Sequence, residues 1–165
     1  MLRALADASE GRVRVELWGA PALDQIPDFH DLVAGSAHLA FKGRYDPEDL
    51  ADIYAHAHFA WAVDFYEAGG NSDWLLPNRL YESLCFGAVP IAAAGVETSR
   101  WLDERGVGVV LAHPLEETLT SFFRTLDSAA YRTLSAAADD LDPAATRYTP
   151  EACRDFAARL AGAPA

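Results

Sequence analysis

Short runs of apolar and β-branched residues alternate along the chain with segments that carry a helical pattern. Residues 12–19 alternate apolar and charged side chains and stop at a glycine, which predicts a strand followed by a turn. Residues 58–65 are almost continuously apolar, as in a parallel strand that is covered on both faces. Three further strands are expected at residues 38–43, 89–94 and 107–112.

Helices are expected between these strands, because start and stop signals bracket the apolar positions. Asp46 and Pro47 mark one helix start, since Asp is a good N-cap and Pro is tolerated at the first helical position. Pro77 opens another helix, which Gly87 ends. Further helical patterns cover residues 97–105, 115–126, 128–141 and 150–160, and an uneven one with a break at Pro27 covers residues 21–33.

This alternation with short connections predicts an α/β fold, in which helices flank a parallel sheet. Ligands of such folds sit at the carboxyl ends of the strands, so the loops that follow the strands are the places to look for chemistry. The length of 165 residues suits a single domain spanning residues 1–165, with a helical C-terminal tail from about residue 127.

Composition narrows the possible partners. With 25 acidic and 13 basic side chains the formal net charge is −12, which argues against a broad nucleic-acid footprint but permits a small anion held by a few arginines. No apolar run approaches the roughly 20 residues of a membrane span, and the first residues do not resemble a secretory signal. Cys85 and Cys153 lack metal-ligand spacing, so two reduced thiols in a cytoplasmic protein are expected.

The segment richest in candidate chemistry is residues 66–94. Asn78 and Glu82 share one face of a helix whose free N-terminal N–H groups, together with Arg79, can bind an anion. A carboxylate one turn further along does not suit an anion but suits a pair of hydroxyl groups, such as a ribose diol. The combination is that of a nucleoside-diphosphate site. The alternative is a capped surface helix in which Arg79 and Glu82 form an ordinary ion pair.

Several ordered pieces of the sequence resemble one known family. They are VELWGAP, FKGRYDPEDLADIYAHAHFAWAV, PNRLYESLCFGAVPIAA, ETSRWL and GVGVVL, and the resemblance covers about residues 2–126. The chain is similar to the C-terminal, donor-binding domain of GT-B-fold glycosyltransferases, the retaining group called family 4. In that family a glutamate of this helix holds the ribose hydroxyls of a sugar nucleotide. Glu82 matches that glutamate, so the resemblance implies the same ribose-diol role that its position on the helix suggests.

The resemblance implies further donor contacts. Asn78 and Arg79 look like additional ligands of the donor, and Thr98 and Ser99 open a helix at the turn that the family places beside the diphosphate. The family motif also has an earlier glutamate, at the position where this chain has Trp74. The nearest match is Glu67, the candidate catalytic residue. It is followed by Gly69 and Gly70, which are candidate donor contacts through their backbone.

A second departure from the family concerns the start of the domain. The family begins with a strand and a phosphate-binding loop, whereas residues 1–7 here resemble the helix that follows that strand. A Rossmann-like sheet that lacks its first strand leaves residues 12–19 and 58–65 without their shared neighbour. The acceptor-binding N-terminal domain is the other expected partner, and any association with a membrane would run through it. The isolated chain is therefore expected to be inactive.

The resemblance thus implies a retaining hexosyltransferase that acts on bacterial surface polysaccharide or glycolipid. This chain would be the half that binds the nucleotide-diphosphate sugar, without a bound metal or other cofactor. The alternative is a non-catalytic module that binds a nucleotide sugar or docks a partner with the same fold. His56 and His58 could share a strand face as metal ligands, but without a third ligand nearby they are expected to be packing or surface residues.

Overall fold

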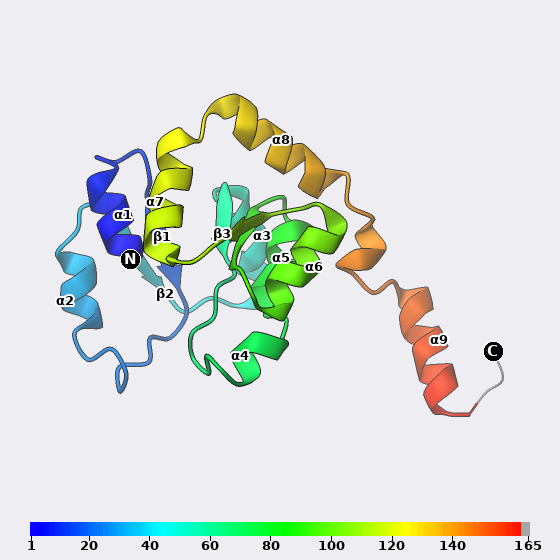
Figure 1. Ribbon diagram of the computed structural model, residues 1–165. Helices are drawn as coiled ribbons and strands as arrows, with labels where there is room; N and C mark the ends of the chain where they lie inside the picture. The colour runs from blue at the N-terminus through cyan, green and yellow to red at the C-terminus, as the bar shows by residue number, and fades with distance from the viewer. Residues whose placement is uncertain (163–165) are drawn as a thin grey trace.

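The computed structural model describes residues 1–162 and confirms the α/β class (Figure 1). Every pair of adjacent strands is parallel. The strands are β1 (Val15–Trp18), β2 (Leu39–Gly43), β3 (Phe59–Trp61), β4 (Val89–Ala93) and β5 (Val109–Leu111). Each expected strand is present, and β3 ends earlier than the apolar run of residues 58–65 predicts.

Helices or helical turns connect all consecutive strands. Between the strands lie α2 (Phe29–Ala34), the short 3-10 helix η1 (Pro47–Asp49), α3 (Leu50–Ala55), α4 (Asn71–Trp74), α5 (Asn78–Cys85) and α6 (Glu97–Arg105). Before and after the strands lie α1 (Leu2–Ala8), α7 (Leu115–Thr125), α8 (Ser128–Asp139), η2 (Pro143–Ala145) and α9 (Pro150–Leu160). The sequence did not predict α4, because residues 66–76 carry the glycine and polar residues of a loop. The break at Pro27 is confirmed, since α2 begins only at Phe29.

The parallel strands form two separate sheets. One has the order β1-β2 and the other the order β3-β4-β5, and no ladder joins β1 to β3 within residues 1–162. The expectation that these two strands lack a shared neighbour is therefore confirmed. Backbone groups along one edge of β1 and one edge of β3 have no strand partner in this part of the chain, as at any sheet edge.

The core surrounds β4, which is buried along its whole length. One face of β4 presents Val89 and Ile91 to Leu5 of α1 and to Leu115 and Leu119 of α7. The opposite face presents Ala92 to a second cluster formed by Leu80, Leu84, Trp101 and Leu102 of α5 and α6. Because side chains alternate across a strand, one buried strand serves both clusters, and the β3-β4-β5 sheet is covered on both faces.

The two sheets differ in how deeply they are buried. No residue of β1 or β2 is fully buried, and α2 also has no buried residue. Helix α1 connects the two regions, because it contacts β1 and also places Leu5 in the core of the larger sheet.

The C-terminal helices α8 and α9 also differ in how much of each is buried. Helix α8 places Ala138 in the second core cluster, whereas α9 has no buried residue and projects away from the sheets (Figure 1). None of the helices described is both long enough and apolar enough to span a lipid bilayer. The last part of the predicted tail, residues 163–165, lies outside the described residues.

Candidate functional site

The candidate site is built around α5, which follows the loop after β3. Arg79, in the first turn of α5, donates a hydrogen bond from Nη2 to the backbone carbonyl oxygen of Val63 at 3.0 Å. Val63 lies just beyond the carboxyl end of β3. The contact fixes the first turn of α5 at the edge where α/β folds bind their ligands. The Nε atom of Arg79 is buried and has no hydrogen-bond partner among the described residues.

Glu82 lies one turn further along α5 and contacts a tyrosine from another helix. The hydroxyl of Tyr54, in α3, donates to Oε2 of Glu82 at 3.3 Å. The Tyr54 ring stacks on the ring of Phe86, with a centroid separation of 6.0 Å and an interplanar angle of 8°. The Arg79–Glu82 ion pair of the alternative interpretation is absent from the described residues, since Arg79 bonds to Val63 instead.

The environment of Tyr54 keeps its phenol protonated. Burial is the main cause of a pKa raised far above the ordinary value, and the negative charge of Glu82 and the hydrogen bond to it act in the same direction. The negative charge of Tyr45 would also raise this pKa and the positive charge of Arg79 lowers it, both less than burial does. Tyr45 follows β2 and Arg79 contacts the end of β3. Tyr54 and Glu82 are in direct contact between α3 and α5, and Arg79 joins the start of α5 to the carboxyl end of β3.

Sequence reasoning identified Arg79 and Glu82 but missed Tyr54. Its spacing along α3 placed it on the apolar face of that helix, and the stacked ring is consistent with that placement. The hydroxyl, however, reaches a carboxylate that is 28 positions away in sequence. Asn78, the other predicted contact from α5, is exposed at the first position of the helix.

The remaining candidates of the β3–α5 loop are engaged with one another. The Glu67 carboxylate accepts a hydrogen bond from the side-chain amide of Asn71, and the Glu67 N–H donates to Ser72 Oγ at 2.9 Å. The N–H of Gly69 donates to the Asp73 carboxylate at 3.2 Å, and that of Gly70 to the Glu67 carbonyl oxygen at 2.9 Å. The structure thus places Glu67 and both glycines in the turn that precedes α4.

Thr98 and Ser99 lie in the first turn of α6, after the carboxyl end of β4. Both residues are buried. The Ser99 hydroxyl donates to the carbonyl oxygen of Val96 at 2.7 Å and accepts from its N–H at 3.3 Å, so it caps the helix. Its side chain is therefore occupied, and a ligand would meet the backbone N–H groups of this turn.

Other charged and aromatic candidates have structural roles. Lys42 of β2 pairs with Glu16 of β1 at 3.1 Å, and His58 packs edge-on against Tyr131 at a centroid separation of 4.9 Å. Across residues 1–162 no three His, Cys, Asp or Glu side chains are grouped in a way that could hold a metal ion.

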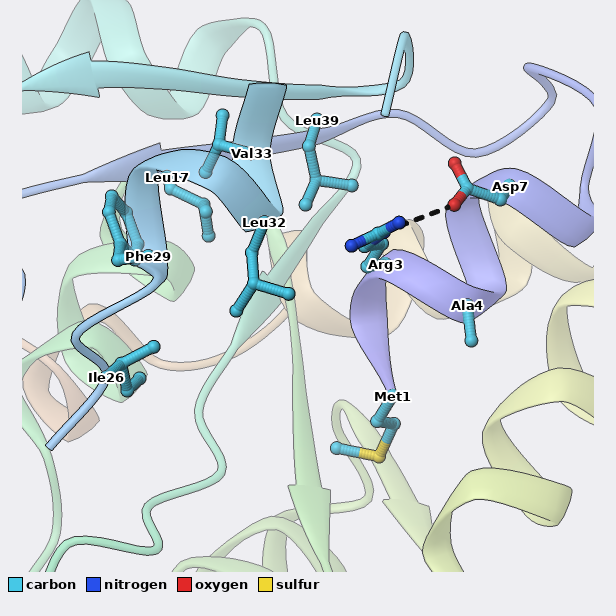
Figure 2. A pocket seen from close by; sticks show the side chains of 10 residues that line it. All are labelled: Met1, Arg3, Ala4, Asp7, Leu17, Ile26, Phe29, Leu32, Val33 and Leu39. Atoms are coloured by element: carbon cyan, nitrogen blue, oxygen red, sulfur yellow. Dashed lines mark ion pairs between the residues drawn. The ribbon is translucent and has the colours of Figure 1, made fainter. Parts of the chain in front are cut away.

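A hollow of about 470 Å³ lies elsewhere, between α1, α2 and the β1-β2 sheet (Figure 2). Its lining is mostly apolar, with Leu17, Phe29 and Leu32 on one side. Arg3 and Asp7 form an ion pair of 3.6 Å on its α1 side. None of the predicted site residues lines this hollow. It marks the place where the small sheet is incompletely covered by its helices.

Comparison with known proteins adds a sequence relative. The chain is 38% identical over 162 residues to the succinoglycan biosynthesis protein ExoL of Rhizobium meliloti strain 1021. The alignment covers 98% of this chain and 40% of ExoL, so the chain spans less than half the length of this relative. No protein-family model matches the sequence.

Solved structures confirm the fold. HepE of Anabaena in complex with UDP-glucose matches with a TM-score of 0.69 at 13% identity, over 97% of this chain and 45% of that one. The HepE complex with UDP and glucose matches with a TM-score of 0.66 at 16% identity, over 96% and 44%. WaaG, a glycosyltransferase involved in lipopolysaccharide biosynthesis, matches with a TM-score of 0.63 at 17% identity, over 94% and 41%. These similarities confirm the Rossmann-like α/β fold.

Proposed function

We propose that this chain is the donor-binding half of a glycosyltransferase that takes a sugar from a nucleotide-diphosphate sugar and adds it to a bacterial surface polysaccharide or glycolipid. The observation that carries the proposal is that α5 presents Arg79 at the carboxyl end of β3 and, one turn further along, Glu82 in contact with Tyr54. It sits on a fold shared with chains whose structures contain UDP or UDP-glucose. The name of ExoL, a succinoglycan biosynthesis protein, supports polysaccharide assembly as the setting.

In this proposal each part of the cluster meets one part of the donor. Glu82 accepts hydrogen bonds from the two ribose hydroxyls. A carboxylate has enough lone pairs to accept these two bonds in addition to the one from Tyr54. The diphosphate lies against the guanidinium of Arg79 and the N-terminal N–H groups of α5 and α6, with Asn78 and Thr98 at its edges. These groups stabilise the negative charge that develops on the departing diphosphate.

The sugar itself would extend toward the loop between β3 and α4. Glu67, Gly69 and Gly70 lie there, and Glu67 would have to release Asn71 to reach a sugar. Transfer with retention follows from the family resemblance, as does the absence of a metal requirement. Two free cysteines, Cys85 and Cys153, agree with the reducing cytoplasm where we place this reaction.

The acceptor would be bound by another domain, as the partial coverage of ExoL and of the solved chains supports. Catalysis between two domains requires both to position their substrates. We therefore expect the chain alone to bind the nucleotide but not to transfer sugar. A non-catalytic module would also bind the nucleotide, but it would not gain activity when joined to the acceptor domain.

Isothermal titration calorimetry with UDP and GDP tests the proposal. The chain should bind one of them, and Glu82→Gln should weaken that binding by at least about tenfold, since hydrogen bonds to a charged group contribute about 1.5–3 kcal/mol. Glu48→Gln, which alters an exposed carboxylate of η1, is the matched control and should bind like the unaltered chain. Absence of binding by the chain joined to its acceptor domain would refute the proposal.

A further inference from the structure

The contact between α3 and α5 involves one neutral donor and one carboxylate. Tyr54 OH bonds to Oε2 of Glu82 at 3.3 Å, and Oε1 of Glu82 has no hydrogen-bond partner among residues 1–162. Glu82 also takes part in no ion pair within those residues. The carboxylate is only partly buried. One of its oxygens is therefore held by the protein while the other stays open to a ligand.

The Tyr54 ring packs nearly parallel against the ring of Phe86, which restricts its orientation. Phe86 is the residue that follows α5, the helix that carries Glu82. The phenol thus has two contacts with α5 and its C-cap, one through its ring and one through its hydroxyl. A fixed phenol in turn restricts the rotation of the flexible Glu82 side chain, which would otherwise lose rotamer freedom when it orders around a ligand.

Charge also favours a permanent donor at this position. The Tyr54 phenol is neutral in the physiological pH range, and burial and the charge of Glu82 raise its pKa further, so it remains a hydrogen-bond donor to the carboxylate. Arg79 bonds to the backbone of Val63, so it does not pull the Glu82 carboxylate away from Tyr54.

We infer that Tyr54 is a positioning residue that orients the Glu82 carboxylate toward the two hydroxyls of a ribose, and so sets the preference of the site for ribonucleoside over 2′-deoxyribonucleoside diphosphates. The inference rests on the proposed function, because it assigns Tyr54 to the same donor site. It adds a specificity role for a residue that does not itself contact the nucleotide.

The test compares ribonucleotides with their 2′-deoxy forms. Dissociation constants for UDP, 2′-deoxy-UDP, GDP and 2′-deoxy-GDP are measured by calorimetry on the unaltered chain and on Tyr54→Phe, Glu82→Gln and Tyr131→Phe. Tyr54→Phe keeps the ring that stacks on Phe86 and removes only the hydroxyl. Tyr131→Phe is the matched control, since its ring packs against His58 and Phe59 in the cluster that contains α7, whereas α5 belongs to the other core cluster.

We expect the unaltered chain to prefer the ribose form, and Glu82→Gln to abolish that preference. Tyr54→Phe should reduce the ribose-to-deoxyribose affinity ratio by about three- to tenfold, the value of one hydrogen bond. The ratio should not change in Tyr131→Phe. A merely structural Tyr54 would lower the affinity for both sugar forms equally and leave the ratio intact.

The outcomes separate the two proposals. If Glu82→Gln abolishes the preference and Tyr54→Phe leaves it unchanged, the positioning role is wrong while the donor site stands. If neither the unaltered chain nor the chain joined to its acceptor domain binds a nucleotide, or if Glu82→Gln has no effect, the proposed function fails and the positioning role fails with it. Thermal unfolding of each variant shows whether a change in the ribose-to-deoxyribose affinity ratio results from unfolding of the variant.

Discussion

Arg79 and Val63 join the start of α5 to the end of β3 through one hydrogen bond of 3.0 Å between a guanidinium and a backbone carbonyl oxygen. The remaining donors of the guanidinium are not all used, since its buried Nε has no partner among the described residues. A buried donor without an acceptor is costly, and an oxygen of a bound diphosphate would remove that cost. The same side chain therefore carries both a structural contact and a predicted ligand contact.

Arg79→Ala should accordingly weaken both binding and folding. We expect nucleoside-diphosphate affinity to fall by about 10- to 100-fold, because a charge-assisted contact contributes about 1.5–3 kcal/mol. Calorimetry measures the affinity and urea denaturation the free energy of unfolding. Arg79→Lys keeps the positive charge but loses the planar guanidinium, so its nucleotide affinity should lie between those of the unaltered chain and Arg79→Ala. Unchanged affinity in Arg79→Ala would remove this residue from the donor site.

A second prediction concerns stability at high pH. The folded-state pKa of Tyr54 is raised above the value of 10.0 expected in the unfolded chain. The unfolded state therefore loses this proton first, and the free energy of unfolding should decrease as pH rises above about 10. Tyr54→Phe should flatten this decrease. Urea denaturation between pH 9 and 11 measures it, and equal slopes for the two proteins would contradict the assigned environment.

Gly108 should be intolerant of a side chain. Its φ is +77°, and a Cβ there would lie 2.9 Å from both the Pro90 carbonyl oxygen and the Leu102 Cδ2. We expect Gly108→Ala to lower the free energy of unfolding by about 2–4 kcal/mol, from backbone strain together with overpacking. Gly106→Ala is the matched control, since φ there is +64° with nothing within 4 Å of the new Cβ. It should cost only about 1 kcal/mol; similar losses in both variants would contradict the close approach.

Arg147 should stabilise the C-terminal end of α5. It donates from Nε to the Cys85 thiol at 3.3 Å and from Nη2 to the Cys85 carbonyl oxygen. A cation at this end of a helix satisfies a free carbonyl and complements the helix dipole. Arg147→Ala should lower the free energy of unfolding by about 1 kcal/mol and speed alkylation of Cys85. Arg154→Ala, which alters an exposed pair on α9, should change neither quantity measurably.

Local signals account for much of what the sequence predicted. Helix α6 begins and ends where expected, at Glu97 and Arg105, because Gly106 supplies a left-handed residue just beyond it. The apolar run of residues 58–65 overstated β3, since Ala62 and Val63 are buried but lie past the ladder with β4. Burial gives the same apolar signal whether or not a strand continues, so the pattern could not place the end of β3.

The candidate site was harder to predict than the helices. Arg79 and Glu82 could be proposed from their spacing on one helix, but their partners come from other elements. The carbonyl of Val63 and the hydroxyl of Tyr54 meet them only after α3, β3 and α5 have packed together. A tyrosine adds a further ambiguity, since its ring belongs to an apolar face and its hydroxyl to a polar site.

The division of the strands into two sheets has a consequence for how the molecule opens. Within the described residues no strand other than β2 pairs with β1, and α1 links this pair to the larger core through Leu5, with Met1 and Leu2 packed beside it. Cooperative units of a protein follow such boundaries, and the unit with fewer buried contacts opens at lower free energy. Amide protons of β1 and β2 should thus exchange with solvent by local opening, while those of β4 should exchange only when the whole chain unfolds.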